Sequence, residues 1–273
     1  MNSGLGDVHN IAYKLASVQQ GLGKEALLDS YEYDRRQVAL VNSQQSLKNG
    51  KQIFSLLKAT GTTDPDIFKA RQNLYHNISN PETLAKIHEG IEGQREHFDN
   101  LGLHIGYIYG HREIPSNASV YEPACVPGAR LPHTWIRALS PKLVELPPID
   151  SSYVSELSKD ELQATQYSAL DLCPFDSFTL IAGQTLVSHW EACFHELQQL
   201  LQDSVAPLKI RLAIEGQDFE VQPGVHGQDW IDLMGLRDGQ VVLVRPDQHI
   251  LASFGRESRA SELVETLSGH LAW

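Results

Sequence analysis

The chain is poor in cysteine and has no long apolar run, and each shortage excludes a class of protein. Its 273 residues include only 3 cysteines, Cys125, Cys173 and Cys193, and no C-x-x-C pair. A disulfide-stapled scaffold is therefore excluded, and the free thiols indicate a reducing, cytoplasmic setting. No stretch approaches the roughly 18 apolar residues of a membrane span, and the opening MNSGLGDVHN lacks the regions of a secretory signal.

Basic residues are also in deficit. The chain has 22 Lys and Arg against 34 Asp and Glu, a net charge of −12. This balance excludes a bulk basic face for nucleic acid or anionic membrane, because such partners need phosphate-neutralising cations. Hydrophobic residues make up 41% of the chain, so a chain of this length can bury a core without a metal or disulfide.

The first hundred residues are predicted to be helical. One apolar stripe recurs at spacings of three and four along Leu5, Val8, Ile11, Leu15 and Val18. Gly21 is a plausible stop for that helix, and a second helix is expected from Lys24 to Gly50. Two more are expected after Pro65 and Pro81, because proline suits a first helical turn.

The middle of the chain is rich in proline. Seven of the 13 prolines lie between Pro115 and Pro148, which disfavours helices there. The aromatic, alternating segment LGLHIGYIYG at 101–110 predicts a strand, and PGARLPHTWI at 127–136 predicts a second extended piece.

From about Leu170 the pattern predicts an alternating α/β domain with the order β-α-β-α-β-β-α. Strands are expected at DSFTLIAG, at 210–214 and at the apolar run Val241–Val244, and the last helix at Ala260–Leu271. A tight turn at Arg245-Pro246-Asp247 should join the last two strands. Alternate residues of the apolar run should face opposite sides of the sheet, and helices should bury both sides.

Three motif-like features have ordinary structural explanations. GLGKEA at 21–26 matches a dinucleotide-binding pattern, but a helix precedes it where a strand is required, so a glycine-rich break between helices is favoured. The 12 histidines include no H-E-x-x-H and no zinc-finger spacing, so no metal site is expected. No G-x-S-x-G marks a serine nucleophile.

Cys173-Pro174 falls where a thioredoxin-type domain would carry its redox pair. Phe175 and Asp176 follow instead of a resolving cysteine, and dithiol exchange needs that second thiol. A structural or docking role is therefore expected for this domain.

The opening segment carries a longer motif. The FAD-dependent aromatic hydroxylases of the phenol hydroxylase and dichlorophenol hydroxylase family have M-N-x-G-x-x-D-x-x-N-L-x-W-K-L followed by L-L-x-x-Y-E-x-E-R-R-P, and the chain resembles them. Matching positions are Met1, Asn2, Gly4, Asp7, Asn10, Lys14, Leu15, Leu27, Leu28, Tyr31, Glu32, Arg35 and Arg36. Departures are Tyr13 for tryptophan, Asp34 for glutamate and Gln37 for proline. LGLHIGYIYG, PGARLPHTWI and VRPDQHI also look like this family's C-terminal half.

The resemblance implies an α/β protein in three parts. Residues 1–100 would be the C-terminal helices of a Rossmann-type FAD-binding domain, 101–169 a Pro-rich middle segment and linker, and 170–273 a thioredoxin-like domain without redox cysteines. The first helix would pack against a sheet that lies upstream in the family. Its stripe of Leu5, Val8, Ile11 and Leu15 would then be partly uncovered here.

The resemblance also implies the chemistry. The family uses NAD(P)H to reduce FAD and hydroxylates a small aromatic substrate with O2. It places the turn Met1, Asn2, Ser3, Gly4 and Leu5 at the flavin ring. A helix N-terminus there would offer N–H groups and partial positive charge to the anionic edge of reduced flavin, and a glycine permits close approach.

The family's nucleotide-binding glycine motif and its catalytic residues lie upstream of the matched motif. We therefore expect a C-terminal half of a monooxygenase, truncated at its N-terminus, that binds FAD weakly or not at all by itself. The alternative is a non-catalytic fragment that acts as a dimerisation or binding module, and the resemblance is compatible with a homodimer. An upstream reading frame with G-x-G-x-x-G would favour the enzyme, and a stop codon just before Met1 would favour the fragment.

All three cysteines are expected to be free. Cys193 lies on the helix that follows the strand after Cys173, so the two Cα atoms should be farther apart than the roughly 7 Å that a disulfide spans. Thiol titration of unfolded protein without reductant should give three thiols per chain. A count of one would contradict this interpretation.

Overall fold

The computed structural model describes residues 2–110, 117–140, 156, 158–164, 167–202, 208–222 and 229–273. It divides by internal contact into two compact units. The first comprises Met1–Arg35, Ile108–Gly110 and Pro123–Trp273, and the second comprises Arg36–Tyr107 and His111–Glu122. The first helix thus groups with the C-terminal part of the chain.

Helix α1 spans Asn2–Gln19 and ends before Gly21, which has a positive φ, as the sequence predicts. The apolar stripe of α1 is largely uncovered in this chain, as expected. Leu5 is 66% exposed, Val8 62% and Leu15 51%. Among the described residues, no helix combines the length and the apolar character that a membrane crossing requires.

Helix α2 spans Ala26–Thr60 and is longer than predicted. The predicted end at Gly50 is wrong, because the helix continues through that glycine. A glycine in a helix costs only about 1 kcal/mol, and the turn at Gly61 ends the helix instead.

Further helices of the second unit follow the predicted prolines. α3 spans Ile67–Ser79 and α4 spans Pro81–Glu92. Asp66 and Asn80 cap them by accepting hydrogen bonds from backbone N–H groups of the first turn. The short helix α5 covers Arg95–Phe98.

The predicted strand at 101–110 is wrong. Leu101–Ile105 forms the short helix α6, and only Ile108 makes an isolated bridge, to Ala129. A Cβ on Gly102 would lie 2.1 Å from the Val120 carbonyl oxygen. This close backbone approach, together with the hydrogen bond from Leu103 N–H to the Ala118 carbonyl at 3.1 Å, overrides the local alternation.

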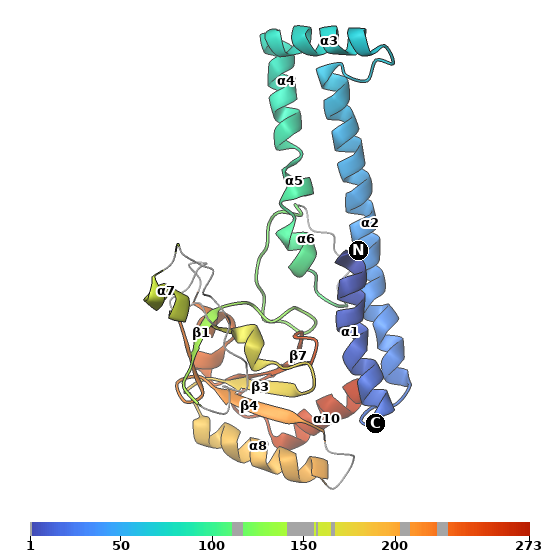
Figure 1. The fold of residues 1–273 in the computed structure, drawn as a ribbon. Helices are drawn as coiled ribbons and strands as arrows, with labels where there is room; N and C mark the ends of the chain where they lie inside the picture. The colour runs from blue at the N-terminus through green and yellow to red at the C-terminus, as the bar shows by residue number, and fades with distance from the viewer. Residues whose placement is uncertain are drawn as a thin grey trace. The chain divides into compact units, whose positions relative to one another are not determined.

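The C-terminal part forms a four-stranded sheet in the order β4-β3-β6-β7. Figure 1 labels three of these strands, β3, β4 and β7. The strands are β3 Phe178–Ala182, β4 Ile210–Ile214, β6 Val241–Val244 and β7 Ile250–Phe254. β3 and β4 are parallel, and the other two pairs are antiparallel. α8 spans Val187–Gln202 and α10 spans Ala260–Leu271, which confirms the predicted last helix.

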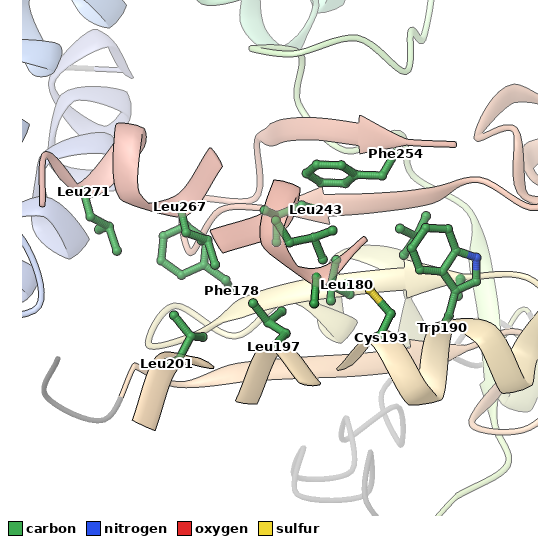
Figure 2. Packing of buried hydrophobic residues seen from close by; sticks show 14 of the residues in the cluster. Phe178, Leu180, Trp190, Cys193, Leu197, Leu201, Leu243, Phe254, Leu267 and Leu271 are labelled. Atoms are coloured by element: carbon green, nitrogen blue, oxygen red, sulfur yellow. The ribbon is translucent and has the colours of Figure 1, made fainter. Parts of the chain in front are cut away.

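The two faces of β6 belong to two separate cores, and all four of its residues are 0% exposed. Val241 and Leu243 face α8 and α10, and Figure 2 shows Trp190, Leu197 and Leu267 directed toward that face. Val242 and Val244 lie in the second core. The predicted alternation and burial of 241–244 are confirmed.

No long helix of the described residues covers the second face, which corrects the prediction that helices bury both sides. It packs against a small antiparallel sheet, β2-β1-β5, and short helical turns. These elements are β1 Trp135–Ala138, β2 Tyr167–Ser168, η2 Ala169–Leu172, β5 Phe219–Val221, α9 Trp230–Leu233 and η3 Leu236–Asp238. Helix α7, Lys159–Ala164, lies between β1 and β2 in the chain.

The turn between β6 and β7 forms where the sequence predicts it. Gln248 N–H donates to the Arg245 carbonyl at 2.9 Å, and Arg245 N–H donates to the His249 carbonyl at 2.8 Å. Pro246 and Asp247 occupy the two central positions, and Gln248 follows with a φ of 59°. A turn followed by a left-handed residue is a common three-residue hairpin connection.

Candidate functional site

The residues predicted to meet a cofactor lie at the start of α1. Met1 lies outside the described residues, and Asn2 begins the helix. Ser3, Gly4 and Leu5 are exposed, and a Cβ built on Gly4 would meet nothing within 4 Å. A helix leaves the N–H groups of its first turn without acceptors inside the helix, so this turn presents donors on an accessible surface.

Arg35 of α2 holds the first two turns of α1 in place. Its Nε donates to Asp7 Oδ1 at 2.8 Å, and its Nη2 donates to the Ser3 carbonyl at 3.3 Å. The side chain is only 4% exposed. A Cβ on Gly6 would lie 2.7 Å from Arg35 Nη2, so the glycine makes room for the guanidinium.

One turn farther along α1, a carboxylate of α2 gathers three donors. Asp34 Oδ2 accepts from Lys14 Nζ at 2.9 Å, from Asn10 Nδ2 at 3.0 Å and from Arg245 Nη2 at 3.1 Å. Asn10 and Lys14 are 0% exposed and Asp34 is 5% exposed. Positions 10 and 14 lie four residues apart, so they share one face of α1.

A second buried carboxylate completes the network from the β6–β7 turn. Asp247, 1% exposed, accepts from Arg245 Nε at 2.9 Å and from Asn10 Nδ2 at 3.1 Å. Arg245 Nη2 donates to both Asp34 and Asp247. We call Asn10, Lys14, Asp34, Arg245 and Asp247 the buried ion network, in which two cations face two carboxylates.

Aromatic rings enclose the Arg245 guanidinium. Its Cζ lies 5.6 Å from the centroid of Tyr13 on α1 and 5.2 Å from that of Tyr109. Desolvated cation–π contacts of this kind contribute about 2 kcal/mol. Tyr13 in turn has its hydroxyl 3.1 Å from His270 Nε2 on α10. Tyr109 stacks on His249 with centroids 4.3 Å apart.

The charges of the network outweigh the cost of burying its carboxylates. Burial alone would raise the pKa of Asp34, but the charges of Arg245 and Lys14 hold that pKa below its ordinary value. The pKa of Asp247 is held far below its ordinary value, because Arg245 overcomes the opposing effect of burial. Both carboxylates are therefore ionised at neutral pH.

The neighbouring groups show the effect of desolvation. Burial lowers the pKa of Lys14, and the charge of Asp34 and its hydrogen bond are the largest effects that oppose this shift. Burial, and then the positive charge of Arg245, lowers the pKa of His270 to about 3. His270 is thus neutral at physiological pH, and its ring nitrogen can accept a hydrogen bond from the Tyr13 hydroxyl.

Metal binding and thiol chemistry find no support among the described residues. They include no group of three or more His, Cys, Asp or Glu side chains arranged to hold a metal ion. Burial raises the pKa of Cys173 to about 12 and that of Cys193 to about 11, so neither thiol is primed as a nucleophile. The buried ion network has its cations already paired, whereas the start of α1 is an exposed helix N-terminus, whose partial positive charge favours an anion.

The sequence indicates the start of α1 as a candidate site, but it does not indicate the buried ion network. Asn10 and Lys14 are matched positions of the motif and Asp34 is a departure from it, and the motif by itself predicts no role for them. Two features of the sequence indicate buried polar contacts. Asn10 and Lys14 are four residues apart on α1, and the polar run RPDQH separates two apolar strands. The pairing of Asn10 with Asp247, which are 237 positions apart, has no local signature.

Comparison with known proteins gives one family model and several full-length relatives. The family model described as "FAD binding domain" matches residues 1–46. The Phenol 2-monooxygenase of Pseudomonas sp. (strain EST1001) is 25% identical over 266 residues, which are 91% of this chain and 38% of that protein. The 2,4-dichlorophenol 6-monooxygenase of Cupriavidus pinatubonensis is 25% identical over 265 residues, 91% of this chain and 39% of that protein.

Solved structures share the fold. The flavin-dependent monooxygenase PieE, in complex with FAD and substrate, superposes with a TM-score of 0.75 at 20% identity. The match covers 99% of this chain and 44% of PieE. Aklavinone-11 hydroxylase, in complex with FAD and aklavinone, gives a TM-score of 0.58 at 19% identity over 100% of this chain and 40% of that one.

These likenesses confirm the resemblance to the FAD-dependent aromatic hydroxylases. The relatives are monooxygenases, and the shared architecture is a mixed helix and sheet fold. The chain spans about two fifths of the length of these two curated relatives, 38% and 39%.

Removing the central carboxylate should destabilise the protein strongly. Asp34→Asn leaves Lys14 without its ion-pair partner and Arg245 with one of two, inside the protein. We expect the free energy of unfolding to fall by about 3–5 kcal/mol, as for other broken buried pairs. Urea unfolding followed by circular dichroism measures this change.

A matched control is Glu220→Gln, which makes the same acid-to-amide change in the exposed pair with Arg137. It should cost no more than about 1 kcal/mol. Equal effects of the two substitutions would contradict the importance of the buried ion network.

His270 should make the protein less stable as the pH falls. Its folded-state pKa of about 3 lies below the ordinary value of 6.5, so its full contribution is present above pH 6.5 and declines as the pH falls toward 3. Between about pH 7 and about pH 5 the loss should be at most about 2 kcal/mol. The two network carboxylates, whose pKa values are lowered, stay ionised over this window.

The variant His270→Gln keeps an acceptor for the Tyr13 hydroxyl but cannot titrate. Its free energy of unfolding should change less over the same window than that of the unaltered chain. Identical pH slopes for the two proteins would show that His270 is not held neutral.

Proposed function

We propose that this chain is part of a FAD-dependent, NAD(P)H-using monooxygenase that hydroxylates a small aromatic compound. The observation that carries the proposal is the match of residues 1–46 to the FAD-binding domain family. In the structure these residues contain the exposed first turn of α1 and the side chain of Arg35 that holds it. The activities named for the relatives, on phenol and 2,4-dichlorophenol, support a phenolic substrate.

The first turn of α1 fits the edge of a flavin ring. The positive end of the helix dipole and the N–H groups of Asn2, Ser3 and Gly4 favour negative charge. The open space around Gly4 allows a planar ring to approach the backbone. The bound flavin would supply the oxygen activation needed for hydroxylation, while Met1, Asn2, Ser3, Gly4 and Leu5 bind and orient its ring.

In the family, the glycine motif that contacts the ADP half of FAD lies upstream of the segment matched here. The chain by itself should therefore bind FAD weakly or not at all, because one helix N-terminus contributes about 1–2 kcal/mol toward the about 8 kcal/mol of a micromolar site. The net charge of −12 leaves nucleic acid an unfavourable partner. The free thiols support a cytoplasmic location.

A second proposal is a non-catalytic dimerisation or binding module. The strand order β4-β3-β6-β7, with one parallel and two antiparallel pairs, supports a thioredoxin-like assignment for the C-terminal sheet. Cys173 has no neighbouring thiol in sequence, and burial raises its pKa to about 12. A domain of this kind would serve assembly rather than redox exchange.

The two proposals differ in the form of the protein in its own cell. An antibody against the α10 segment should capture a flavin-coloured protein, alone or in complex, that oxidises NAD(P)H faster when a phenol is added. Capture of a colourless polypeptide of 30.4 kDa, with no flavin released on denaturation, would favour the binding module. Titration of the purified 273-residue chain with FAD, followed by flavin fluorescence, should show weak or no quenching.

A further inference from the structure

The elements that hold α1 come mostly from the other end of the chain. Asn10 reaches Asp247 in the β6–β7 turn, and Tyr13 lies against Arg245 and His270. Val18 packs against the core on the α8 and α10 side of the sheet. From its third turn to its end, α1 is therefore fixed to C-terminal residues.

The junction between α1 and α2 is fastened in the same way. Lys24 N–H donates to the Leu271 carbonyl at 3.0 Å, and Trp273 Nε1 donates to the Leu22 carbonyl at 2.6 Å. Leu27, 1% exposed, is part of the core formed by β3, β6, α8 and α10. The junction from Leu22 to Leu27 is thus held by the last helix, the C-terminal residue Trp273 and the sheet.

Arg245 contacts more of these elements than any other side chain of the buried ion network. It binds Asp34 of α2 and Asp247 of its own turn, and its guanidinium lies between the rings of Tyr13 and Tyr109. Only a planar, delocalised cation can bind two carboxylates and stack on rings at once, so lysine cannot replace it fully. Displacement of α1 would leave buried charges without partners.

We propose that the β6–β7 turn, through Arg245, positions α1 so that its first turn meets the flavin. Arg245 is thus a positioning residue that acts through Tyr13, Asp34 and the helix they belong to. The inference rests on the proposed function for its cofactor, but the placement of α1 is a property of this chain alone. It assigns the C-terminal sheet a part in forming the cofactor site.

Hydrogen exchange on the full chain tests the placement directly. In Arg245→Lys, amides of α1 beyond its first turn and of the first ten residues of α2 should exchange about tenfold faster or more. Amides of β3 and β6 should keep their protection, because their two cores are unchanged. The matched control Arg137→Lys alters an exposed pair with Glu220 and should leave α1 unaffected.

A second variant guards against unfolding. Asn10→Ala removes the hydrogen bonds of Asn10 to Asp247 and Asp34 and keeps the Lys14–Asp34 ion pair, so no charge is left unpaired. It should also loosen α1 selectively. Unchanged protection of α1 in both variants would overturn the proposal. Equal loss of protection throughout the sheet in both would also overturn it, since that pattern marks a general structural role.

A second measurement adds excess FAD to the same proteins. Any protection of the start of α1 should be weak, and it should be smaller in Arg245→Lys than in the unaltered chain. Equal, detectable FAD protection in the two would overturn the positioning role while leaving flavin binding intact. Absence of FAD protection agrees with the weak binding expected of the chain alone; the proposed function is then decided by the protein captured from its own cell, and the exchange of α1 without FAD still decides its placement.

Discussion

The requirement that buried charges be paired governs the arrangement of the first unit. Lys14, Asp34, Arg245 and Asp247 are all at most 5% exposed, and an unpaired charge in such a place costs several kcal/mol. One arrangement pairs them all, and it needs α1, the start of α2 and the β6–β7 turn together. Helix α1 and the first ten residues of α2 are therefore part of the same compact unit as the C-terminal sheet.

The buried ion network has more to do with placement than with net stability. An apolar cluster of the same volume would be about as stable, since desolvation consumes much of the Coulombic gain. An apolar surface, however, tolerates small shifts of a helix, whereas three donors on one oxygen of Asp34 do not. We infer that the network fixes α1 and so the direction in which its exposed first turn points.

Elements with a strong local pattern could be predicted from the sequence. The apolar run 241–244 and the stripe of α10 come from local periods, and both were predicted with their correct bounds. The predicted strand at 101–110 is wrong because the close approach of this segment to the backbone of residues 118–120 decides its conformation. Its own alternation does not. Periodicity contains no information about such contacts.

The candidate site was predictable to the same limited degree. The start of α1 could be predicted as a candidate because its motif is contiguous, so a resemblance points to Ser3 and Gly4, and their role stays a prediction. The buried ion network was missed because its members are scattered from Asn10 to Asp247 and single polar residues on apolar faces are common in any core. Only the folded chain brings Asn10 to within 3.1 Å of Asp247.

The dependence of α1 and α2 on the C-terminal turn can be measured as a coupling energy. A double-mutant cycle with Asp34→Asn and Arg245→Met, followed by urea unfolding, isolates the interaction between α2 and the turn. The free energy of unfolding that the double variant loses should be smaller than the sum of the two single losses by at least about 1.5 kcal/mol. Losses that add to within about 0.5 kcal/mol would show that the two residues act independently, and the central claim would then be wrong.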